Sequence, residues 1–123
     1  MPDHVLLVDD DEDLMDIVSE RLKNRGMNVD TVGNVDKALL WLANKHYDAI
    51  ILDFLMPGMD GFETIRTIRK QQPGIRILLV TGQMLADDGR KAIQMGADAV
   101  LEKPADLEVL VKAIRPSKPG KDG

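Results

Sequence analysis

The residues best suited to chemistry are carboxylates, one hydroxyl and one ammonium group, and each comes where a short apolar run ends. They are Asp9, Asp10, Asp11, Asp53, Thr81, Glu102 and Lys103. Clustered carboxylates repel one another by roughly 1 to 4 kcal/mol per pair at about 4 Å. Mg²⁺ removes that cost and suits a site of one or two carboxylates with waters and phosphate oxygens. A carboxylate can attack phosphorus, while a metal ion, an ammonium and a hydroxyl stabilise the phosphoryl oxygens. If these groups meet, they fit phosphoryl acceptance by one aspartate.

The segments that must position these residues are apolar runs that alternate with amphipathic stretches. The predicted strands cover residues 5–8, 27–32, 49–52, 75–80 and 99–101. The predicted helices cover residues 11–25 and 87–95, follow Asn34, precede Pro73 and begin at Asp106. Because strands that alternate with helices need right-handed crossovers, the pattern predicts a parallel sheet with helices on both faces. The carboxyl ends of its strands share one edge, where open α/β sheets bind ligands, so residues 9 to 103 converge there.

Apolar stripes on the predicted helices indicate which side of each helix is buried. On the first helix the stripe consists of Leu14, Ile17, Val18 and Leu22. On helix 87–95 the stripe is weaker and consists of Ala92, Ile93 and Met95. Trp41 lies off the stripe of its helix, and we expect a partly buried position at the edge. We assign no catalytic role to His4 or His46.

The composition excludes several classes of function. The chain has 123 residues and no cysteine, which fits one domain and excludes a disulfide scaffold, a thiol nucleophile and an iron–sulfur site. Its net charge of −5 argues against nucleic-acid binding, which normally needs a basic face. No apolar run approaches the ~20 residues that span a bilayer. We therefore expect a cytoplasmic protein without direct contacts to nucleic acid or membrane.

Four motifs resemble those of a known family. They are LLVDDDED at 6–13, DFLMPGMDG at 53–61, LLVTG at 78–82 and GADAVLEKP at 96–104. In this order and at these strand ends, they resemble the receiver domain of two-component response regulators, especially chemotaxis regulators, over about residues 3–115. The resemblance implies a flavodoxin-like fold: a doubly wound, five-stranded parallel sheet in the order 2-1-3-4-5, with five helices on two faces. Residues 116–123 are expected to form a flexible tail or the start of a linker.

The resemblance also implies a phosphorylation site that uses Mg²⁺. Asp53 would be phosphorylated from the phosphohistidine of a histidine kinase. The metal would be held directly by Asp10, Asp53 and the backbone carbonyl of Leu55, and Asp9 would act through a metal-bound water.

Two further residues, Thr81 and Lys103, would contact the phosphoryl group, and the family implies a cis bond between Lys103 and Pro104. The sequence departs from the family at Val100, where an aromatic residue is common. In the family this ring moves into the space that the threonine leaves, and valine is too small to do so. The alternative to this ring movement is a conformational change through the loop after Thr81.

Two other departures, Leu55 and Gln83, occupy positions that tune how water reaches the acyl phosphate in the family. Leu55 offers an attacking water no side-chain hydrogen bond, whereas Gln83 can orient one. Because these effects oppose each other, we predict no phosphoryl lifetime.

The leading prediction is a signalling phosphoacceptor rather than an enzyme, because such a domain turns over no external substrate. The implied partners are a sensor histidine kinase or phosphotransfer protein, and a downstream protein or an effector domain of a longer chain. The implied output surface consists of helix 87–95, strand 99–101 and the helix after Asp106, and a homodimer through the same surface is one option.

Three alternatives stay open at this point. A docking-only receiver, with weak or no phosphorylation-dependent switching, is favoured by Val100. An aspartyl-phosphate phosphatase of the haloacid dehalogenase type would need a second aspartate where Leu55 stands, and a cap domain. A flavodoxin-like nucleotide or flavin protein would need a loop rich in Gly, Ser or Thr where the sequence has three aspartates. Those aspartates also suit the start of a helix without any further function.

Overall fold

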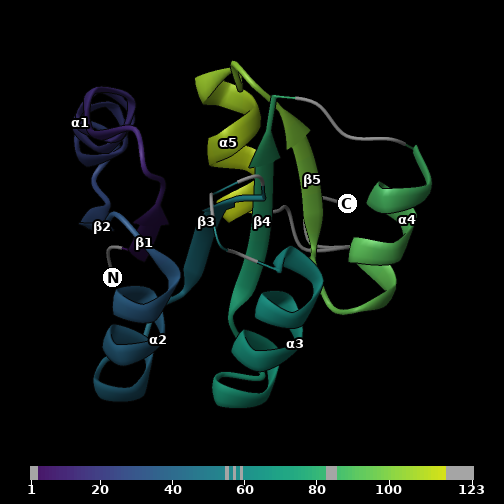
Figure 1. The fold of residues 1–123 in the computed structure, drawn as a ribbon. Helices are drawn as coiled ribbons and strands as arrows, with labels where there is room; N and C mark the ends of the chain where they lie inside the picture. Colours follow the sequence, from purple (N-terminus) through teal and green to yellow (C-terminus); the bar gives the residue numbers. More distant parts are fainter. Residues whose placement is uncertain (1–2, 55, 57, 59, 83–85, 116–123) are drawn as a thin grey trace, which may run out of the picture.

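Strands and helices alternate along the chain in the computed structural model, which describes residues 3–54, 56, 58, 60–82 and 86–115 (Figure 1). The strands are β1 (His4–Val8), β2 (Asn28–Val32), β3 (Ala49–Asp53), β4 (Arg76–Thr81) and β5 (Ala99–Glu102). The helices are α1 (Glu12–Lys23), α2 (Val35–Asn44), α3 (Gly61–Gln71), α4 (Ala86–Gln94) and α5 (Leu107–Ile114). Each predicted element is present, and where both ends were predicted the bounds differ by one or two residues. The expected tail 116–123, with Leu55 and Gln83, lies outside the described residues.

The strands form one parallel sheet in the order β2-β1-β3-β4-β5. The central strands β1, β3 and β4 are almost entirely buried, because helices cover both of their faces. The edge strands β2 and β5 are partly exposed, and β2 accommodates the charged Asp30. The strand order and the doubly wound arrangement confirm the predicted flavodoxin-like fold.

Alternate residues of the central strands face two separate cores. On β1, Val5 and Leu7 belong to one core, and Leu6 and Val8 belong to the other. The first core is covered by α1 and α5, and the second by α2, α3 and α4, so that the sheet lies between two helical layers (Figure 1). Both layers leave the carboxyl ends of the strands accessible at one edge.

Local signals set the starts of the helices. The Asp11 carboxylate accepts a hydrogen bond from the backbone N–H of Leu14 and caps α1, and the Asn34 side chain caps α2 in the same way. Gly26 has a φ of 85° just after α1, which a residue without a β-carbon adopts easily. These observations confirm the predicted helix start at Asp11, whereas α1 ends at Lys23, two residues before the predicted end at Arg25.

The buried side of α1 differs from the predicted one. The buried residues of α1 are Met15, Ser19 and Leu22, and of these Leu22 belongs to the predicted stripe and is buried as predicted. Ile17, which the apolar stripe placed in the core, is 50% exposed because it borders a groove between α1 and α5. On α4, Ala92 is buried as predicted, but Ile93 is 47% exposed. The predictions that Ile17 and Ile93 face the core were wrong.

Polar side chains connect the loops at the amino ends of the strands. The Arg69 guanidinium donates to the backbone carbonyls of Pro73, Ile75 and Gly96 and to the carboxylate of Asp98. At the β2 edge of the sheet, Asp30 interacts with the hydroxyl of Tyr47, the ring of His4 and the ammonium of Lys45. Burial opposes ionisation of Asp30, but these donors outweigh it and hold the pKa of Asp30 below its ordinary value of 3.8.

Trp41 and His46 both lie outside the carboxyl edge of the sheet. Trp41 is partly buried against the second core, as predicted, and the Lys45 ammonium lies 5.1 Å from its ring centroid. His46 is exposed. Within residues 3–115, apart from those not described, no helix is long and apolar enough to cross a membrane.

Candidate functional site

Two neighbouring strands deliver the carboxylates. Asp9 directly follows β1 and Asp53 ends β3, and the register places Val8 opposite Leu52, so the two aspartates follow side by side. Asp9 and Asp53 are 5% and 8% exposed, whereas Asp10 is exposed. One carboxylate oxygen from each of the three aspartates lies within 4.8 Å of the others. The parallel sheet thus brings together the carboxylates that the sequence placed 44 residues apart.

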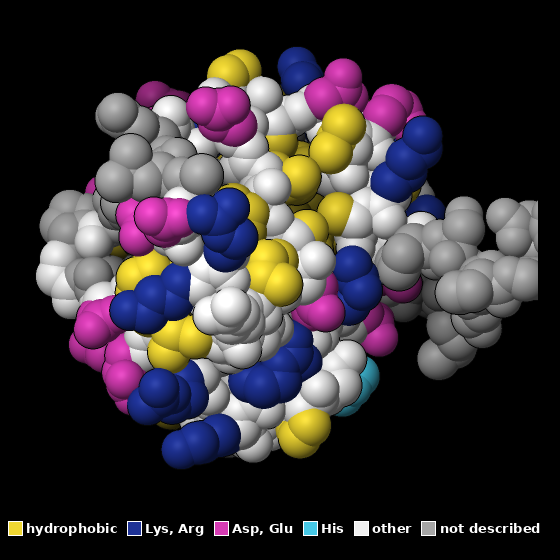
Figure 2. All heavy atoms as spheres, turned by 90° about the vertical axis from the view of Figure 1, so that its right-hand side faces the viewer, with side chains coloured by type: hydrophobic (Ala, Val, Ile, Leu, Met, Phe, Trp, Pro, Cys, Tyr) yellow, Lys and Arg dark blue, Asp and Glu magenta, His cyan; other side chains and the backbone are white. Residues whose placement is uncertain are grey.

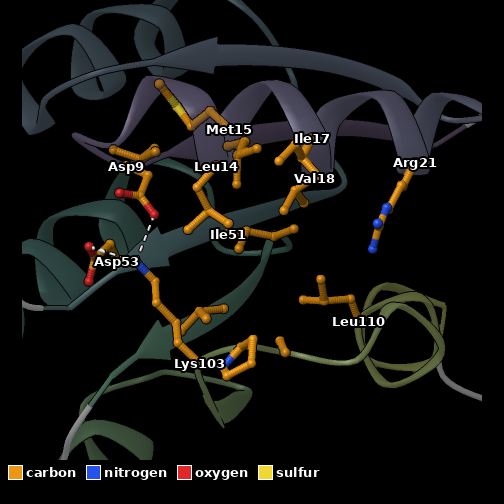
Figure 3. Close-up of a pocket in the computed structure, with 15 residues that line it drawn as sticks. Asp9, Leu14, Met15, Ile17, Val18, Arg21, Ile51, Asp53, Lys103 and Leu110 are labelled. Atoms are coloured by element: carbon orange, nitrogen blue, oxygen red, sulfur yellow. Dashed lines mark hydrogen bonds and ion pairs between the residues drawn. The ribbon is translucent and has the colours of Figure 1, made fainter.

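The Lys103 ammonium connects two of these carboxylates (Figure 3). Its Nζ donates to Oδ2 of Asp9 at 2.9 Å and to Oδ2 of Asp53 at 3.1 Å. The residue directly follows β5, and its peptide bond to Pro104 is cis, as the resemblance implied. Burial opposes the charged form, but the hydrogen bonds to both carboxylates outweigh it and raise the pKa of Lys103 above its ordinary value of 10.5. The lysine therefore stays positively charged at neutral pH.

The start of α1 holds Asp9 in place. Oδ1 of Asp9 accepts from the backbone N–H of Asp11 at 3.0 Å, and its other oxygen accepts from Lys103. Asp11 in turn uses its side chain to cap α1. The three consecutive aspartates therefore differ in environment: Asp9 is buried and bonded, Asp10 is exposed, and Asp11 belongs to the helix start.

The other sequence-predicted residues come from β4 and β5. Thr81 ends β4, is 1% exposed, and directly follows Val80, which is the register partner of Asp53. The backbone N–H of Lys103 donates to the Thr81 carbonyl at 2.8 Å, which fixes the loop after β5 against the end of β4. Val100 lies opposite Leu79 and packs against the core on the α2, α3 and α4 side.

The donor set fits a hard divalent cation. Three carboxylates approach within 4.8 Å of one another, and Lys103 neutralises one of their three charges. Asp9, Asp10 and Asp53 each offer carboxylate oxygens, which Mg²⁺ and Ca²⁺ prefer as ligands. The predicted ligand at the backbone carbonyl of Leu55, and the predicted tuning positions Leu55 and Gln83, lie outside the described residues.

A groove with a volume of about 370 Å³ runs from this site between α1 and α5 (Figure 3). We call it the α1–α5 groove. Its lining includes Leu14, Ile17, Val18, Arg21, Ile51, Leu110 and the site residues Asp9, Asp53 and Lys103. Leu14, Val18 and Arg21 point from α1 toward α5 (Figure 3). Sequence reasoning missed this groove, although the spacing of residues 14, 17, 18 and 21 marks one helical face, because it assigned that face to the core.

Comparison with known proteins places these features in a family. Residues 5–115 match the profile of the response regulator receiver domain. Over 114 residues the chain is 31% identical to the probable transcriptional regulatory protein TcrX of Mycobacterium tuberculosis, with 93% of this chain and 49% of that protein covered. The chain spans about half of the length, or less, of the curated relatives that it matches.

Two solved structures are similar over most of the chain. One is a response regulator protein from Burkholderia pseudomallei with a phosphorylated aspartic acid, a calcium ion and citrate: the TM-score is 0.87, the identity 29%, and the coverage 93% of this chain and 67% of that one. The other is the chemotaxis response regulator CheY4 of Vibrio cholerae, with a TM-score of 0.83, 31% identity, and coverage of 93% and 97%.

Proposed function

Because this chain belongs to the response regulator receiver domain family, we propose that Asp53 accepts a phosphoryl group from a phosphohistidine of a sensor histidine kinase or a phosphotransfer protein. The observation that carries the proposal is the position of the Asp53 carboxylate, 3.1 Å from the Lys103 ammonium and beside Asp9 and Asp10 at the carboxyl edge of the sheet. The phosphorylated aspartic acid in the Burkholderia pseudomallei structure supports the same chemistry. The receiver domain would comprise residues 3–115.

The transfer needs one bond to form and one to break. A carboxylate oxygen of Asp53 attacks phosphorus, the bond from phosphorus to the donor imidazole nitrogen breaks, and that nitrogen keeps the electron pair and takes up a proton. Lys103 would contact the phosphoryl oxygens, and its hydrogen bond from Nζ to Asp53 supports this role. Thr81, at the end of the adjacent strand, would donate a hydrogen bond from its hydroxyl to a phosphoryl oxygen. No external substrate is turned over, since the product stays on Asp53.

We assign the cation of this site as Mg²⁺. Asp10 and Asp53 would hold it directly, with the backbone carbonyl of Leu55, and Asp9 would bind it through water. When bound, Mg²⁺ supplies positive charge next to the phosphoryl oxygens. The exposure of Asp10 beside the buried pair supports this division of ligands, because Mg²⁺ keeps several waters and needs access to solvent.

The α1–α5 groove supports a protein as the phosphoryl donor. It begins at Asp53 and carries the half-exposed Ile17 on its α1 side, and a partly apolar surface next to a reacting group suits a helix of a docking partner.

We expect Ile17→Glu to slow transfer from a kinase or phosphotransfer protein by about tenfold or more. Phosphorylation by acetyl phosphate should be unchanged. Leu40→Glu, at the 61% exposed Leu40 on α2, is the matched control.

The proposed output surface is formed by α4, β5 and α5. Hydrophobic side chains gather on this face and charged residues surround them (Figure 2). Ile93 on α4 and Val109 on α5 are 47% and 45% exposed. A downstream protein, an effector domain of a longer chain, or a second copy of this domain would cover such a surface.

One alternative keeps a specific observation in its favour. A docking-only receiver would tolerate Val100, whose side chain packs against the core and offers no ring to follow Thr81. The acceptor, the lysine and the acidic pair are nevertheless all placed together, which favours phosphorylation. The phosphatase and flavodoxin-type alternatives have no comparable support, because Leu55 replaces the second aspartate and three acidic residues stand where a phosphate loop is needed.

The test is the intact mass after incubation with Mg²⁺ and acetyl phosphate. We expect one added phosphoryl group on the wild type and on the control variant Asp16→Asn, an exposed carboxylate on α1. Asp53→Asn should gain no mass, and EDTA should prevent the gain in the wild type. If neither acetyl phosphate nor a cognate kinase phosphorylates the wild type, the docking-only alternative replaces this proposal.

A further inference from the structure

The residue after the proposed acceptor begins a chain of ring contacts that ends on α4. Phe54 directly follows Asp53, and its backbone N–H donates to the Val80 carbonyl at 3.3 Å. Its ring centroid lies 5.2 Å from that of Phe62 in the first turn of α3, with the ring planes at 67°. The Lys91 ammonium of α4 lies 4.4 Å from the centroid of Phe62. The residue after β3 is thus connected to α3 and α4 by contacting side chains.

The Phe54 ring fits against the start of α3 because residue 61 is glycine. A β-carbon built on Gly61 would lie 2.3 Å from Cε1 of Phe54, which no packed structure tolerates. The close approach fixes the ring beside the first turn of α3. The edge-to-face arrangement with Phe62 is a favourable geometry for two aromatic rings, so a shift of one ring displaces the other.

Lys91 has a particular place among the charged groups of α4. In the described part of the chain, it makes the one charged side-chain contact from α4 to another element, whereas Arg90 pairs with Asp87 inside the helix. Ala92 anchors α4 to the core. The contact between Lys91 and Phe62 therefore biases where α4 sits against α3.

We propose that Phe54, Phe62 and Lys91 form an aromatic bridge that couples phosphoryl acceptance at Asp53 to the position of α4. This inference rests on the proposed function and adds the route by which the site reaches its output surface. The aromatic bridge takes the part that a ring at position 100 cannot take here, since Val100 packs against the same core but carries no ring. Phe54 shares a peptide bond with Asp53, so an adjustment of the acceptor backbone moves its ring.

The contact between Lys91 and the Phe62 ring sets the size of the coupling between Asp53 and α4. A cation over a ring at a partly exposed site changes an equilibrium constant by a factor of about two to five. Because coupling is reciprocal, α4 and ligand binding at Asp53 must influence each other by the same factor. Weakening the aromatic bridge should therefore change the affinity for a phosphoryl mimic as well as the response of α4.

The experiment is a titration with beryllofluoride in the presence of Mg²⁺, followed by amide NMR. The variants are Lys91→Met, Phe62→Leu and the double variant, with Lys70→Met on α3 as a control that removes one exposed lysine. We expect both single variants to change the beryllofluoride affinity in the same direction by about two- to fivefold. The double variant should change it no further, because each substitution removes the same contact. The amides of α4 should also respond less than in the wild type.

Three results would overturn the aromatic bridge. If the amides around Asp53 respond in all variants, while affinity and the α4 response match the wild type and Lys70→Met, the aromatic bridge is overturned and the proposed function stands. Additive effects of Lys91→Met and Phe62→Leu would also overturn it, because the two residues would then act separately. If the wild type shows no response around Asp53, the proposed function fails and the aromatic bridge fails with it.

Discussion

Replacing Lys103 by methionine tests whether charge balance holds the site together. In the wild type its Nζ lies 2.9 Å and 3.1 Å from carboxylate oxygens of Asp9 and Asp53. In Lys103→Met those buried carboxylates, with oxygens within 4.8 Å, face each other without a cation. At an effective dielectric constant of about 20, their repulsion is about 3 kcal/mol. Removing one partner of a buried pair typically costs about 3 to 5 kcal/mol, so we expect a loss of about 3 kcal/mol in the free energy of unfolding.

The measurement is urea unfolding at pH 7 in EDTA, with Lys70→Met as the control. That exposed lysine should change the free energy of unfolding by no more than about 0.5 kcal/mol. Saturating Mg²⁺ should then narrow the gap between Lys103→Met and the wild type, because a bound cation replaces the lost positive charge and stabilises only the folded state.

Two results would refute this reasoning. If Lys103→Met unfolds at the wild-type urea concentration in EDTA, the repulsion between the buried carboxylates is not a significant part of the stability. If its deficit in EDTA is as large as expected but stays unchanged in Mg²⁺, the carboxylates do not bind the cation, and the proposed metal site is wrong.

Three further predictions concern the scaffold around the site. Arg69→Met removes four hydrogen bonds and should lower the free energy of unfolding by about 2 to 4 kcal/mol in urea, whereas Arg66→Met should change it little. Gly61→Ala places a β-carbon 2.3 Å from a phenylalanine ring and should cost about 1 to 3 kcal/mol, but Gly74→Ala, where nothing lies within 4 Å, should be nearly neutral. The lowered pKa of Asp30 gives stability that is present above its unfolded value of 3.8 and lost as the pH falls through the folded value. Asp30→Asn should therefore be less stable than the wild type at pH 7, and in thermal melts this difference in stability should narrow below about pH 3.8. A difference that stays constant with pH would contradict the lowered pKa of Asp30.

The order and type of the elements could be predicted because their signals are local. Buried parallel strands need continuous apolar runs such as residues 49–52, and a helix start needs an acceptor such as Asp11 or Asn34 for its free N–H groups. Each of these requirements involves only a few neighbouring residues, so it can be recognised in a short segment of the sequence. The cis bond before Pro104 and the strand order came instead from the resemblance to a family, and the structure confirms both.

The orientation of α1 could not be predicted from the same kind of pattern. Two overlapping stripes share Leu22: the first is the predicted one, with Leu14, Ile17 and Val18, and the second contains Met15 and Ser19. Met15 is rotated from Leu14 by about 100° about the helix axis. Both are apolar enough to be buried. Which one faces the core depends on how α1 sits against β1 and α5, and the choice of the second stripe leaves the first to line the α1–α5 groove.

By itself the sequence determined the inventory of reactive groups and the strand ends that carry them, because both follow from residue types and their immediate neighbours. Only the tertiary structure decided that Lys103 contacts Asp9 and Asp53 at the same time, across 94 and 50 residues. It also decided that Phe54, Phe62 and Lys91 meet. Such contacts depend on the register of the sheet and the angles between layers, which the whole core sets together and no short segment encodes.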